Sequence, residues 1–489
     1  MVAAPPQGGG VGKSGLRVAF LTSEAVPFAK TGGLGDVSGA LPKALVGAGL
    51  DACLIHPLYA TTDRRLLSER VFDNLEVEWL GRRRRVAVYL SEAAGAPAFL
   101  IDEPEYFGRE RVYGYGDDHL RFAFFSRAAL ALTGRLGPPP DVIHGNDWPS
   151  GFALAWLRAG RSWGGFHART RTLLSIHNLA YQGLFDPGDL YRLGVRHGEE
   201  SNAYLSDGAA SSLKAGLLAA DAISTVSRRY SYEIRTPEHG HGLDWLLRQR
   251  QDRLIGITNG VDYDAWNPAT DPHLAAHFTA DDLAGKRACK LDLLRRLGLP
   301  AEPDRPVVAA ISRLVSQKGF DLLQQSAHQL LETGAFFVAL GSGESEFEGF
   351  LQRMRDVAPH RVAYYRGFNE PLAHQIEAGA DIFLMPSLFE PCGLNQMYSM
   401  RYGTIPVVRA TGGLDDTVEH WDPTRGAGTG FKFEPYTAHA MMEKLREALF
   451  WYARPGAWRQ MQSNGMRVDN SWEEAARKYV RVYEALQSF

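Results

Sequence analysis

The sequence predicts an α/β protein with two doubly wound, Rossmann-like domains. From Arg17 onward, short apolar runs alternate with longer amphipathic stretches, and the same alternation restarts near residue 307. Apolar strands that alternate with helices are typical of parallel sheets covered on both faces. The length of 489 residues agrees, since a domain takes about 100–200 residues.

The pattern places the strands and helices of each half in order. In the first half we expect strands at 18–22, 52–56, 86–90, 98–102, 142–144, 172–177 and 222–226, and helices at 36–46, 119–133, 150–158 and 211–219. In the second half we expect strands at 307–311, 336–340, 362–365, 382–385 and 405–408, and helices at 321–331, 344–354, 371–378 and 394–402.

These elements set the expected domain boundaries. Residues 1–15 have no apolar core and are expected to form a flexible leader; residues 16–257 form the N-terminal domain and 258–470 the C-terminal domain. Residues 262–303 contain two X-Pro turns and are interpreted as a connection. The helical segment 472–488 is long enough for residues 471–489 to cross back onto the first domain. Ligands of doubly wound sheets bind at the carboxyl ends of the strands, so we expect the two domains to face each other across a cleft.

Composition and charge exclude several classes of function. Lys and Arg total 53 and Asp and Glu total 56, a formal net charge of −3, without the basic surplus expected of a protein that binds nucleic acid or an anionic membrane. The four arginines at 82–85 are interpreted as a solvated strand edge or turn. Three cysteines are too few for a disulfide framework or a zinc site, which favours a reducing compartment, and we expect the cytoplasm. No apolar window approaches the length of a membrane span.

The leader contains a stretch, GGGVGKS at 8–14, that is similar to a phosphate-binding P-loop. The P-loop pattern needs a glycine where Gln7 stands, and the loop should follow a strand rather than precede one. We therefore reject a P-loop here.

Two glycine-rich turns between a predicted strand and helix are candidate anion-binding loops. The first is KTGGLGD at 30–36, which begins with Lys30, and the second is TGGL at 411–414. Glycines allow backbone N–H groups to approach an anion, and the start of a helix adds its positive dipole end. A Gly-Gly turn alone is more often purely structural, but Lys30 at the mouth of the first loop favours an anion site there.

Three further clusters follow predicted strands. Arg313 and Lys318 lie at a strand end and a helix start, where two cations suit a diphosphate. Glu390 in FEPCGL at 389–394 could accept hydrogen bonds from sugar hydroxyls, or could simply cap a helix. The clusters HGNDW at 144–148 and SIHNL at 175–179 place histidines where they could be catalysts or structural hydrogen bonders.

At these residues the sequence resembles the bacterial glycogen synthases and plant starch synthases, which use nucleotide-glucose donors. The resemblance covers nearly the whole chain from about Arg17. It rests on six ordered motifs: KTGGLGDV at 30–37, HNLAYQG at 177–183, TNGVD at 258–262, SRL with QKG at 312–319, FEPCGL at 389–394 and TGGL at 411–414.

The resemblance implies a retaining glycosyltransferase of GT-B architecture. It would transfer glucose from a nucleotide donor, in the bacterial form ADP-glucose, to the non-reducing end of an α-1,4-glucan. The implied mechanism is a front-face displacement in which the leaving phosphate oxygen accepts the proton of the acceptor, so no glycosidase-type pair of carboxylates is needed. No cofactor and no metal are expected, and the partners are the donor and the glucan. Oligomeric state is not readable from the sequence.

The resemblance also assigns roles to residues. Catalytic roles fall to His177, Glu390, Lys318, Arg313 and Asp147. Donor contacts fall to Lys30, Gly33, Asn259, Arg313, Lys318, Phe368, Glu390, Cys392, Gly393, Leu394, Thr411 and Gly412. Among these, Phe368 is expected to stack on adenine, and closure of the two domains is expected to hinge near residues 259–262.

The chain departs from the family pattern in its first half, which the family uses for acceptor contact. Residues 206–214 read SDGAASSLK, without the usual aromatic and Phe-Leu-Lys ending, and Pro149 and Ser150 follow Trp148 where relatives often have His or Gln and Thr. Tyr398 stands where related families have the second carboxylate of a Glu-x₇-Glu pattern.

Other functions remain as alternatives. The nearest is a transferase that acts on a short maltooligosaccharide; a non-catalytic protein that binds a sugar nucleotide or glucan would be a different class, opposed by the intact Lys30, His177 and Glu390. A dinucleotide-dependent dehydrogenase fails because Ser38 stands where the third glycine of Gly-x-Gly-x-x-Gly belongs.

Overall fold

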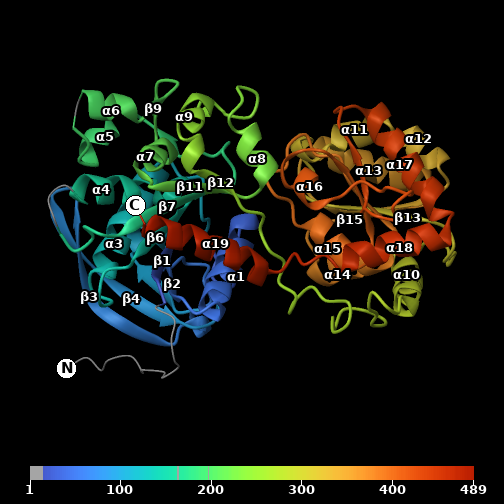
Figure 1. Ribbon diagram of the computed structural model, residues 1–489, viewed down its shortest axis with the longest axis horizontal. Coiled ribbons are helices and arrows are strands. Elements are labelled where there is room, and N and C mark those ends of the chain that lie inside the picture. Colours follow the sequence, from blue (N-terminus) through green and yellow to red (C-terminus); the bar gives the residue numbers. More distant parts are fainter. Residues whose placement is uncertain (1–14, 162–164, 197, 489) are drawn as a thin grey trace. The chain divides into compact units, whose positions relative to one another are not determined.

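The structure is a computed structural model that describes residues 15–161, 165–196 and 198–488. The P-loop-like stretch and the predicted leader up to residue 14 lie outside the described residues. The chain forms two compact units (Figure 1). The first contains the described residues up to Ser224, together with Arg250–Arg253 and the residues from Ala475 onward; the second contains Thr225–Gln249 and Leu254–Glu474.

The sheet of the first unit has a parallel centre and an antiparallel edge. Its order is β11-β7-β6-β1-β2-β5-β4-β3, in which β1, β2, β5, β6 and β7 pair in parallel and β4 pairs antiparallel with both β3 and β5. The strands are β1 (Arg17–Leu21), β2 (Asp51–Pro57), β3 (Glu69–Trp79), β4 (Arg82–Ser91), β5 (Ala98–Asp102), β6 (Val142–Asn146), β7 (Arg171–Ile176) and β11 (Ala222–Thr225).

The long strand β3 is absent from the sequence prediction, and its burial explains why. Most of its side chains are exposed or half-buried, so it carries charged residues and lacks an apolar run. β3 pairs with the arginine run of β4 at the turn of the hairpin, where Arg85 Nε donates to Glu76 Oε1 at 3.2 Å. The run is therefore a solvated part of a hairpin, as the sequence indicates.

Helices and short strands complete the first unit. They are α1 (Gly33–Gly47), η1 (Arg64–Leu66), α2 (Pro104–Phe107), α3 (Asp118–Thr133), η2 (Trp148–Ser150), α4 (Gly151–Arg161), β8 (Leu184–Phe185), α5 (Asp189–Arg192), α6 (Glu199–Ala203), β9 (Leu205–Ser206), β10 (Ala209–Ser211), α7 (Ser212–Ala219) and η3 (Gln251–Arg253). The last helix of the chain, α19 (Trp472–Leu486), buries Tyr479 and Tyr483, and the Tyr483 hydroxyl lies 2.8 Å from His144 Nδ1. The end of the chain therefore contributes to the core of the first unit.

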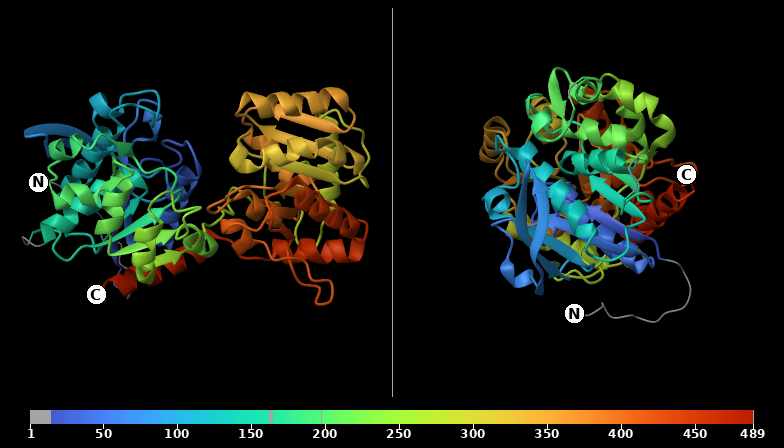
Figure 2. Two further views of the ribbon diagram at one scale, coloured as in Figure 1. Left: turned by 90° about the horizontal axis from the view of Figure 1, so that it is seen from above. Right: turned by 90° about the vertical axis from the view of Figure 1, so that its left-hand side faces the viewer.

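The second unit is a fully parallel sheet between two layers of helices (Figure 1; Figure 2 gives a view from above). Its order is β15-β14-β13-β16-β17-β18. Val308 and Ala310 of β13 pack into one apolar core, and Val307 and Ala309 pack into another. Successive side chains of a strand point to opposite faces, so both faces of this sheet are buried, as the apolar runs predict.

The strands of this sheet are β13 (Val307–Ile311), β14 (Phe336–Gly341), β15 (Val362–Arg366), β16 (Ile382–Met385), β17 (Ile405–Arg409) and β18 (Phe431–Phe433). The short strand β12 (Leu254–Gly256) is not part of it. Its helices are α8 (Arg228–Glu233), α9 (Asp244–Gln249), α10 (Ala284–Arg296), η4 (Ser316–Lys318), α11 (Phe320–Gln325), α12 (Ala327–Glu332), α13 (Ser345–Val357), α14 (Glu370–Gly379), α15 (Asn395–Arg401), α16 (Gly412–Thr417), α17 (Ala438–Tyr452) and α18 (Pro455–Met466).

The segment predicted as a connection, 262–303, is an ordered part of the second unit. It contains α10, whose buried residues include Lys286 and Lys290. Lys286 Nζ donates to the carbonyl of Tyr402 and to Thr404 Oγ1, both at 2.8 Å, and Lys290 Nζ lies 2.6 Å from Asp381. Lysines are rarely buried unless paired, so the two buried lysines interrupt the apolar face of α10 and weaken the pattern by which a sequence indicates a helix.

The ring of Tyr398 packs against the segment 262–303. The ring of Trp266 is stacked between those of Tyr398 and His374, at centroid distances of 4.0 and 3.7 Å. Tyr398 therefore has a packing role where related families have a carboxylate.

The compact units divide the chain differently from the predicted boundary at residue 257. Thr225–Gln249 belongs to the second unit, because α8 packs on α16 through the hydrogen bonds described below. Among the residues that the structure describes, no helix is long and apolar enough to cross a membrane.

Candidate active site

The first glycine loop lies between β1 and α1 and carries Lys30. Gly32 is the N-cap of α1, with extended backbone. The Glu24 carboxylate accepts hydrogen bonds from the N–H groups of Thr31 and Gly32 through Oε2, and Oε1 accepts the hydroxyl of Tyr113 at 2.8 Å. Two of the N–H groups predicted to approach a ligand are thus bonded to the chain's own carboxylate.

Lys30 and Gly33 remain accessible in this loop. Lys30 Nζ donates to Asp36 at 2.7 Å, and the Lys30 side chain is 47% exposed. A Cβ on Gly33 would meet nothing within 4 Å, so packing does not require glycine there. The open space at Gly33 leaves the backbone approachable, as a ligand-binding loop needs.

Asp147 and His177 meet at the carboxyl ends of β6 and β7. Asp147 Oδ1 accepts the backbone N–H of His177 at 2.7 Å, and His177 Nε2 lies 2.9 Å from Asn146 Oδ1. Asp147 has a φ of 52°, which is uncommon for a residue other than glycine. Strained backbone of this kind persists where the surrounding structure holds it, often at functional sites.

Burial sets the protonation of this pair. It raises the pKa of Asp147 to about 7, against the hydrogen bonds from the backbone N–H groups of His177 and Asn178, which lower it. Burial also lowers the pKa of His177 to about 4. His177 is therefore neutral near pH 7 and offers one N–H donor and one acceptor.

His144, in the same sequence cluster as Asp147, belongs to the core. Its Nδ1 faces Tyr483 at 2.8 Å and its Nε2 faces Ser175 Oγ at 2.6 Å. Both ring nitrogens are used inside the protein, so of the alternatives left open for this histidine the structure supports the structural hydrogen bonder.

In the second unit, Lys318 and Glu390 form a close ion pair. Lys318 Nζ donates to Glu390 Oε2 at 2.5 Å, with side-chain exposures of 18% and 8%, and Ser387 Oγ donates to the same oxygen at 3.2 Å. Lys318 follows β13 and Glu390 follows β16, and these two strands are parallel neighbours. Parallel strands present their carboxyl ends at one edge, where ligands of such sheets bind.

The second glycine turn packs directly on the backbone that carries Glu390. The N–H of Gly413 donates to the Glu390 carbonyl at 3.1 Å. Gly412 has a φ of +45°, and a Cβ there would lie 1.9 Å from that same carbonyl oxygen. The structure thus brings the predicted residues Thr411 and Gly412 against Glu390 and Cys392, and glycine is required at 412 by contact and by backbone angle.

Arg313 and Phe368 lie at the same edge of the sheet and are exposed. Arg313 follows β13, and Phe368, between β15 and α14, is 80% exposed. An apolar ring with so little packing contributes little to the fold and is free to contact a ligand.

Asn259 and the FEPCGL loop complete the predicted donor side. Asn259 is buried and its Oδ1 has no hydrogen-bond partner among the described residues. Gly393 has a φ of +71°, and Leu394 is the N-cap of α15. Burial raises the pKa of Cys392 to about 12, so its thiol is neutral.

The predicted residues therefore form two groups. Lys30, Gly33, Asp147 and His177 belong to the first unit, and the remaining predicted residues belong to the second. Two carboxylates that organise the glycine loops, Glu24 and Glu233, are absent from the sequence prediction. Glu24 directly follows a strand, a signal that could have indicated it; Glu233 lies in a six-residue helix, with no signal. In the described parts of the chain, no group of three His, Cys, Asp or Glu side chains could hold a metal ion.

Comparisons with known proteins identify the fold and the family of the chain. Residues 17–249 match the model of the starch synthase catalytic domain, and residues 297–455 match that of glycosyl transferases group 1. The fold and its parallel-sheet edges are those of a two-domain GT-B glycosyltransferase. A sucrose-phosphate synthase from Thermosynechococcus elongatus, 18% identical with a TM-score of 0.59, shares this fold.

Closer relatives define the family. Glycogen synthase from Anaeromyxobacter sp. (strain Fw109-5) is 45% identical over 492 residues, covering 96% of this chain and 99% of the relative. Glycogen synthase from Geobacillus stearothermophilus is 42% identical, covering 96% and 98%. The catalytic domain of starch synthase IV from Arabidopsis thaliana, solved with ADP and acarbose, is 35% identical with a TM-score of 0.88, covering 97% and 100%. The chain belongs to the glycogen synthase and starch synthase family, whose fold and function the sequence predicts: it is a glucosyltransferase that elongates an α-1,4-glucan.

Proposed function

We propose that the protein transfers glucose from ADP-glucose to the non-reducing end of an α-1,4-glucan, with retention of configuration and without a metal. The observation that carries this proposal is the Lys318–Glu390 pair at the carboxyl ends of β13 and β16. A buried carboxylate can accept hydrogen bonds from sugar hydroxyls, while Lys318 and the exposed Arg313 neutralise the charge that develops on a leaving diphosphate.

The other predicted residues have further roles in the proposed reaction. In the proposal, Asp147 and His177 contact the transferred sugar, and Lys30 with Gly33 contacts donor and acceptor. Asn259, Thr411, Gly412 and the backbone N–H groups of Cys392, Gly393 and Leu394 contribute to donor binding. The leaving phosphate oxygen accepts the acceptor's hydroxyl proton as the new glycosidic bond forms on the same face.

The choice of ADP-glucose is supported by the ADP bound to the Arabidopsis relative and by the exposed Phe368 ring, which can stack on a base. The test measures kcat/KM for ADP-glucose and UDP-glucose with glycogen as acceptor. We expect a preference for ADP-glucose of at least about tenfold, equivalent to roughly 1.4 kcal/mol, and a higher KM for ADP-glucose in Phe368→Ala. Equal use of both donors would refute the ADP assignment without touching the transferase assignment.

Metal independence rests on charge. Lys30, Arg313 and Lys318 supply the positive charge that a divalent ion supplies in other enzymes with a phosphate or diphosphate leaving group. Activity should survive exhaustive dialysis against EDTA, and a strict requirement for Mg²⁺ or Mn²⁺ would overturn this part of the proposal.

The chain length of the acceptor needs a separate test, because the departures from the family pattern lie in the first half of the chain. Chain-length analysis of products from labelled donor, with glycogen and with maltose offered separately, distinguishes a glucan synthase from a transferase limited to short acceptors. Extension of glycogen chains supports the proposal; products confined to short oligosaccharides favour the alternative, and no product from either acceptor favours a non-catalytic binding protein. A cytoplasmic location, proposed from the low cysteine content, is tested by cell fractionation.

A further inference from the structure

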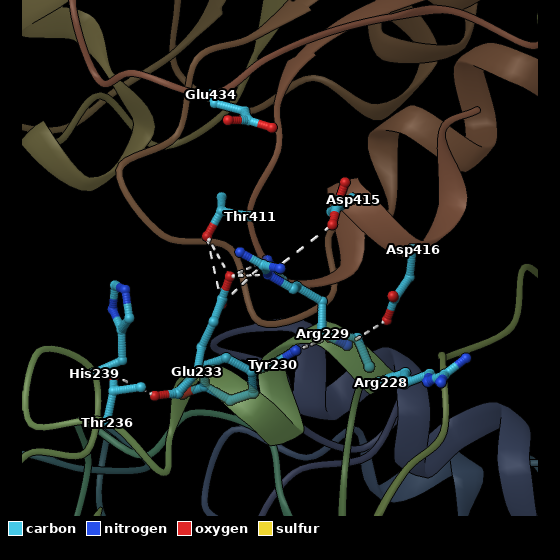
Figure 3. Close-up of polar contacts among 12 residues, drawn as sticks. Arg228, Arg229, Tyr230, Glu233, Thr236, His239, Thr411, Asp415, Asp416 and Glu434 are labelled. Carbon is cyan, nitrogen blue, oxygen red and sulfur yellow. Dashed lines mark hydrogen bonds and ion pairs between the residues drawn. The ribbon is translucent and has the colours of Figure 1, made fainter. Parts of the chain in front are cut away.

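Two six-residue helices, α8 and α16, cap each other through carboxylates (Figure 3). Glu233 at the end of α8 accepts the Gly412 N–H at 3.1 Å on both carboxylate oxygens, and Thr411 Oγ1 donates to it at 3.3 and 3.4 Å. In return, Asp416 of α16 accepts the N–H of Arg229 at 2.8 Å. Unpaired N–H groups at helix starts favour carboxylates, so this reciprocal arrangement fixes the two helices against each other.

The surroundings of Glu233 hold its carboxylate in one position. It is only 9% exposed, and Arg229 Nε lies 3.2 Å from its Oε1. Arg229 also reaches toward Asp415, at 4.0 Å, and Asp415 is paired with Lys432 at 2.8 Å. The carboxylate is thus charge-compensated and hydrogen-bonded, as a buried carboxylate requires.

The turn that Glu233 holds is the turn on which Glu390 rests. Gly412 and Gly413 allow so close an approach that added Cβ atoms would lie 1.9 Å from the Glu390 carbonyl oxygen and 2.0 Å from that of Cys392. The Gly413 N–H donates to the Glu390 carbonyl at 3.1 Å. A shift of the turn therefore moves the Glu390 backbone, because nothing flexible lies between them.

We propose that Glu233 is a positioning residue for the glucosyl transfer: it fixes the Thr411–Gly412–Gly413 turn and, through it, the place of Glu390. This inference deepens the proposed function and rests on it. Glu233 acts through the backbone and is not itself a catalytic residue. Misplacement of a reacting group by about 1 Å can cost about 10²-fold in rate, so loss of the support should appear in turnover.

The experiment compares Glu233→Ala, Glu233→Gln and the control Glu238→Gln. Glu238 lies five residues further along, and its side chain is 80% exposed. For each purified full-length variant, ADP binding sites are counted by calorimetry, and kcat and KM for ADP-glucose are measured per binding site with glycogen as acceptor. Melting temperatures are recorded alongside.

We expect Glu233→Ala to lower kcat per binding site by about tenfold or more. Glu233→Gln should stay within about threefold of wild type, because an amide oxygen can still accept the Gly412 N–H, and Glu238→Gln should equal wild type. A merely structural role would instead lower the number of binding sites and leave kcat per site unchanged, which would overturn the inference.

The remaining outcomes are also decisive. If Glu233→Ala yields no folded protein, Glu233→Met carries the test, because methionine fills a similar volume but cannot accept the Gly412 N–H: a wild-type kcat per site in this variant would overturn the inference, and a reduced one would support it. If the wild-type protein itself turns over no nucleotide glucose, the proposed function fails first, which separates the two failures.

Discussion

Lys318 and Glu390 form an ion pair at 2.5 Å, although they are 72 residues apart in the sequence and follow two neighbouring strands, β13 and β16. Any sugar hydroxyl that binds Glu390 must share this carboxylate with an ammonium group. The pair therefore fixes the orientation of the carboxylate, and it couples sugar binding to the cation expected at the diphosphate.

Replacing the carboxylate tests this coupling. Glu390→Gln should lower kcat by about 10²-fold or more, because an amide keeps the shape but loses the charge. The variant should still fold, since the amide oxygen can accept from Lys318. Steady-state kinetics and a melting curve check this, with Glu443→Gln, an exposed carboxylate of the same unit, as the matched control. Wild-type turnover in Glu390→Gln would remove this residue from the site.

Replacing Lys30 should also lower activity without lowering stability. Its ion pair with Asp36 is exposed, and such pairs contribute about 0–1 kcal/mol, so Lys30→Ala should melt within about 2 °C of wild type. We expect kcat/KM for ADP-glucose to fall at least tenfold, because a cation at the phosphate is lost. Arg65→Ala, which removes an exposed cation paired with Asp63 on the same unit, should change neither quantity. Equal kinetics in the two variants would argue against a ligand contact by Lys30.

Asp147 gives a pH-dependent prediction. Its folded pKa, about 7, lies above the ordinary value of 3.8, so the folded protein binds this proton more tightly than the unfolded chain does. The contribution of Asp147 to stability therefore falls as pH rises from about 4 to about 7 and is constant above that.

Asp147→Asn removes this dependence, and asparagine tolerates the positive φ. The melting temperature of Asp147→Asn relative to wild type should increase by at least about 2 °C between pH 4.5 and pH 7 and then level off. His177, with a lowered pKa of about 4, contributes the opposite slope between about pH 4 and 6.5, but it is present in both proteins and largely cancels in the difference. A difference independent of pH would show that the pKa of Asp147 is not raised.

The two glycine loops should respond differently to alanine. Gly33→Ala introduces a methyl group into open space. The free energy of unfolding should therefore stay the same or rise by at most about 1 kcal/mol, and the melting temperature should not fall. Its kcat/KM should nevertheless fall if a ligand approaches this backbone. Gly412→Ala places a methyl group against the Glu390 carbonyl at a left-handed φ and should lower both stability and kcat. Unchanged kinetics in Gly33→Ala would remove Gly33 from the ligand contacts.

The parallel strands could be predicted closely because burial on both faces leaves an unmistakable apolar run. The strands β5, β13 and β16 have the predicted bounds. The predicted helix at 321–331 is divided at Ser326, whose hydroxyl bonds back to the Leu322 carbonyl at 2.7 Å. Such a side-chain bond competes with the helix, but its formation cannot be read from residue types alone.

Candidate site residues could be proposed from the sequence where a polar or charged residue follows a predicted strand, and only there. Arg313, Lys318, His177 and Glu390 all come after apolar runs. The partners of these residues are set by tertiary structure: nothing near Glu233 in the sequence indicates that it will meet Gly412, 179 residues away. Sequence patterns thus indicate candidate ligand contacts more readily than they indicate the residues that hold those candidates in place.

The contribution of α19 to the first unit has a consequence for the order of synthesis. Tyr479, Tyr483 and Leu486 are almost fully buried there, and Tyr483 completes the hydrogen bonds of His144. On the ribosome, residues up to 224 emerge first, yet their core lacks these side chains until the final turns of the helix have been made. The second unit, which takes Leu254–Glu474 from the middle of the chain, has nearly all its residues earlier. The part of the protein that is translated first is therefore the part whose core is completed last.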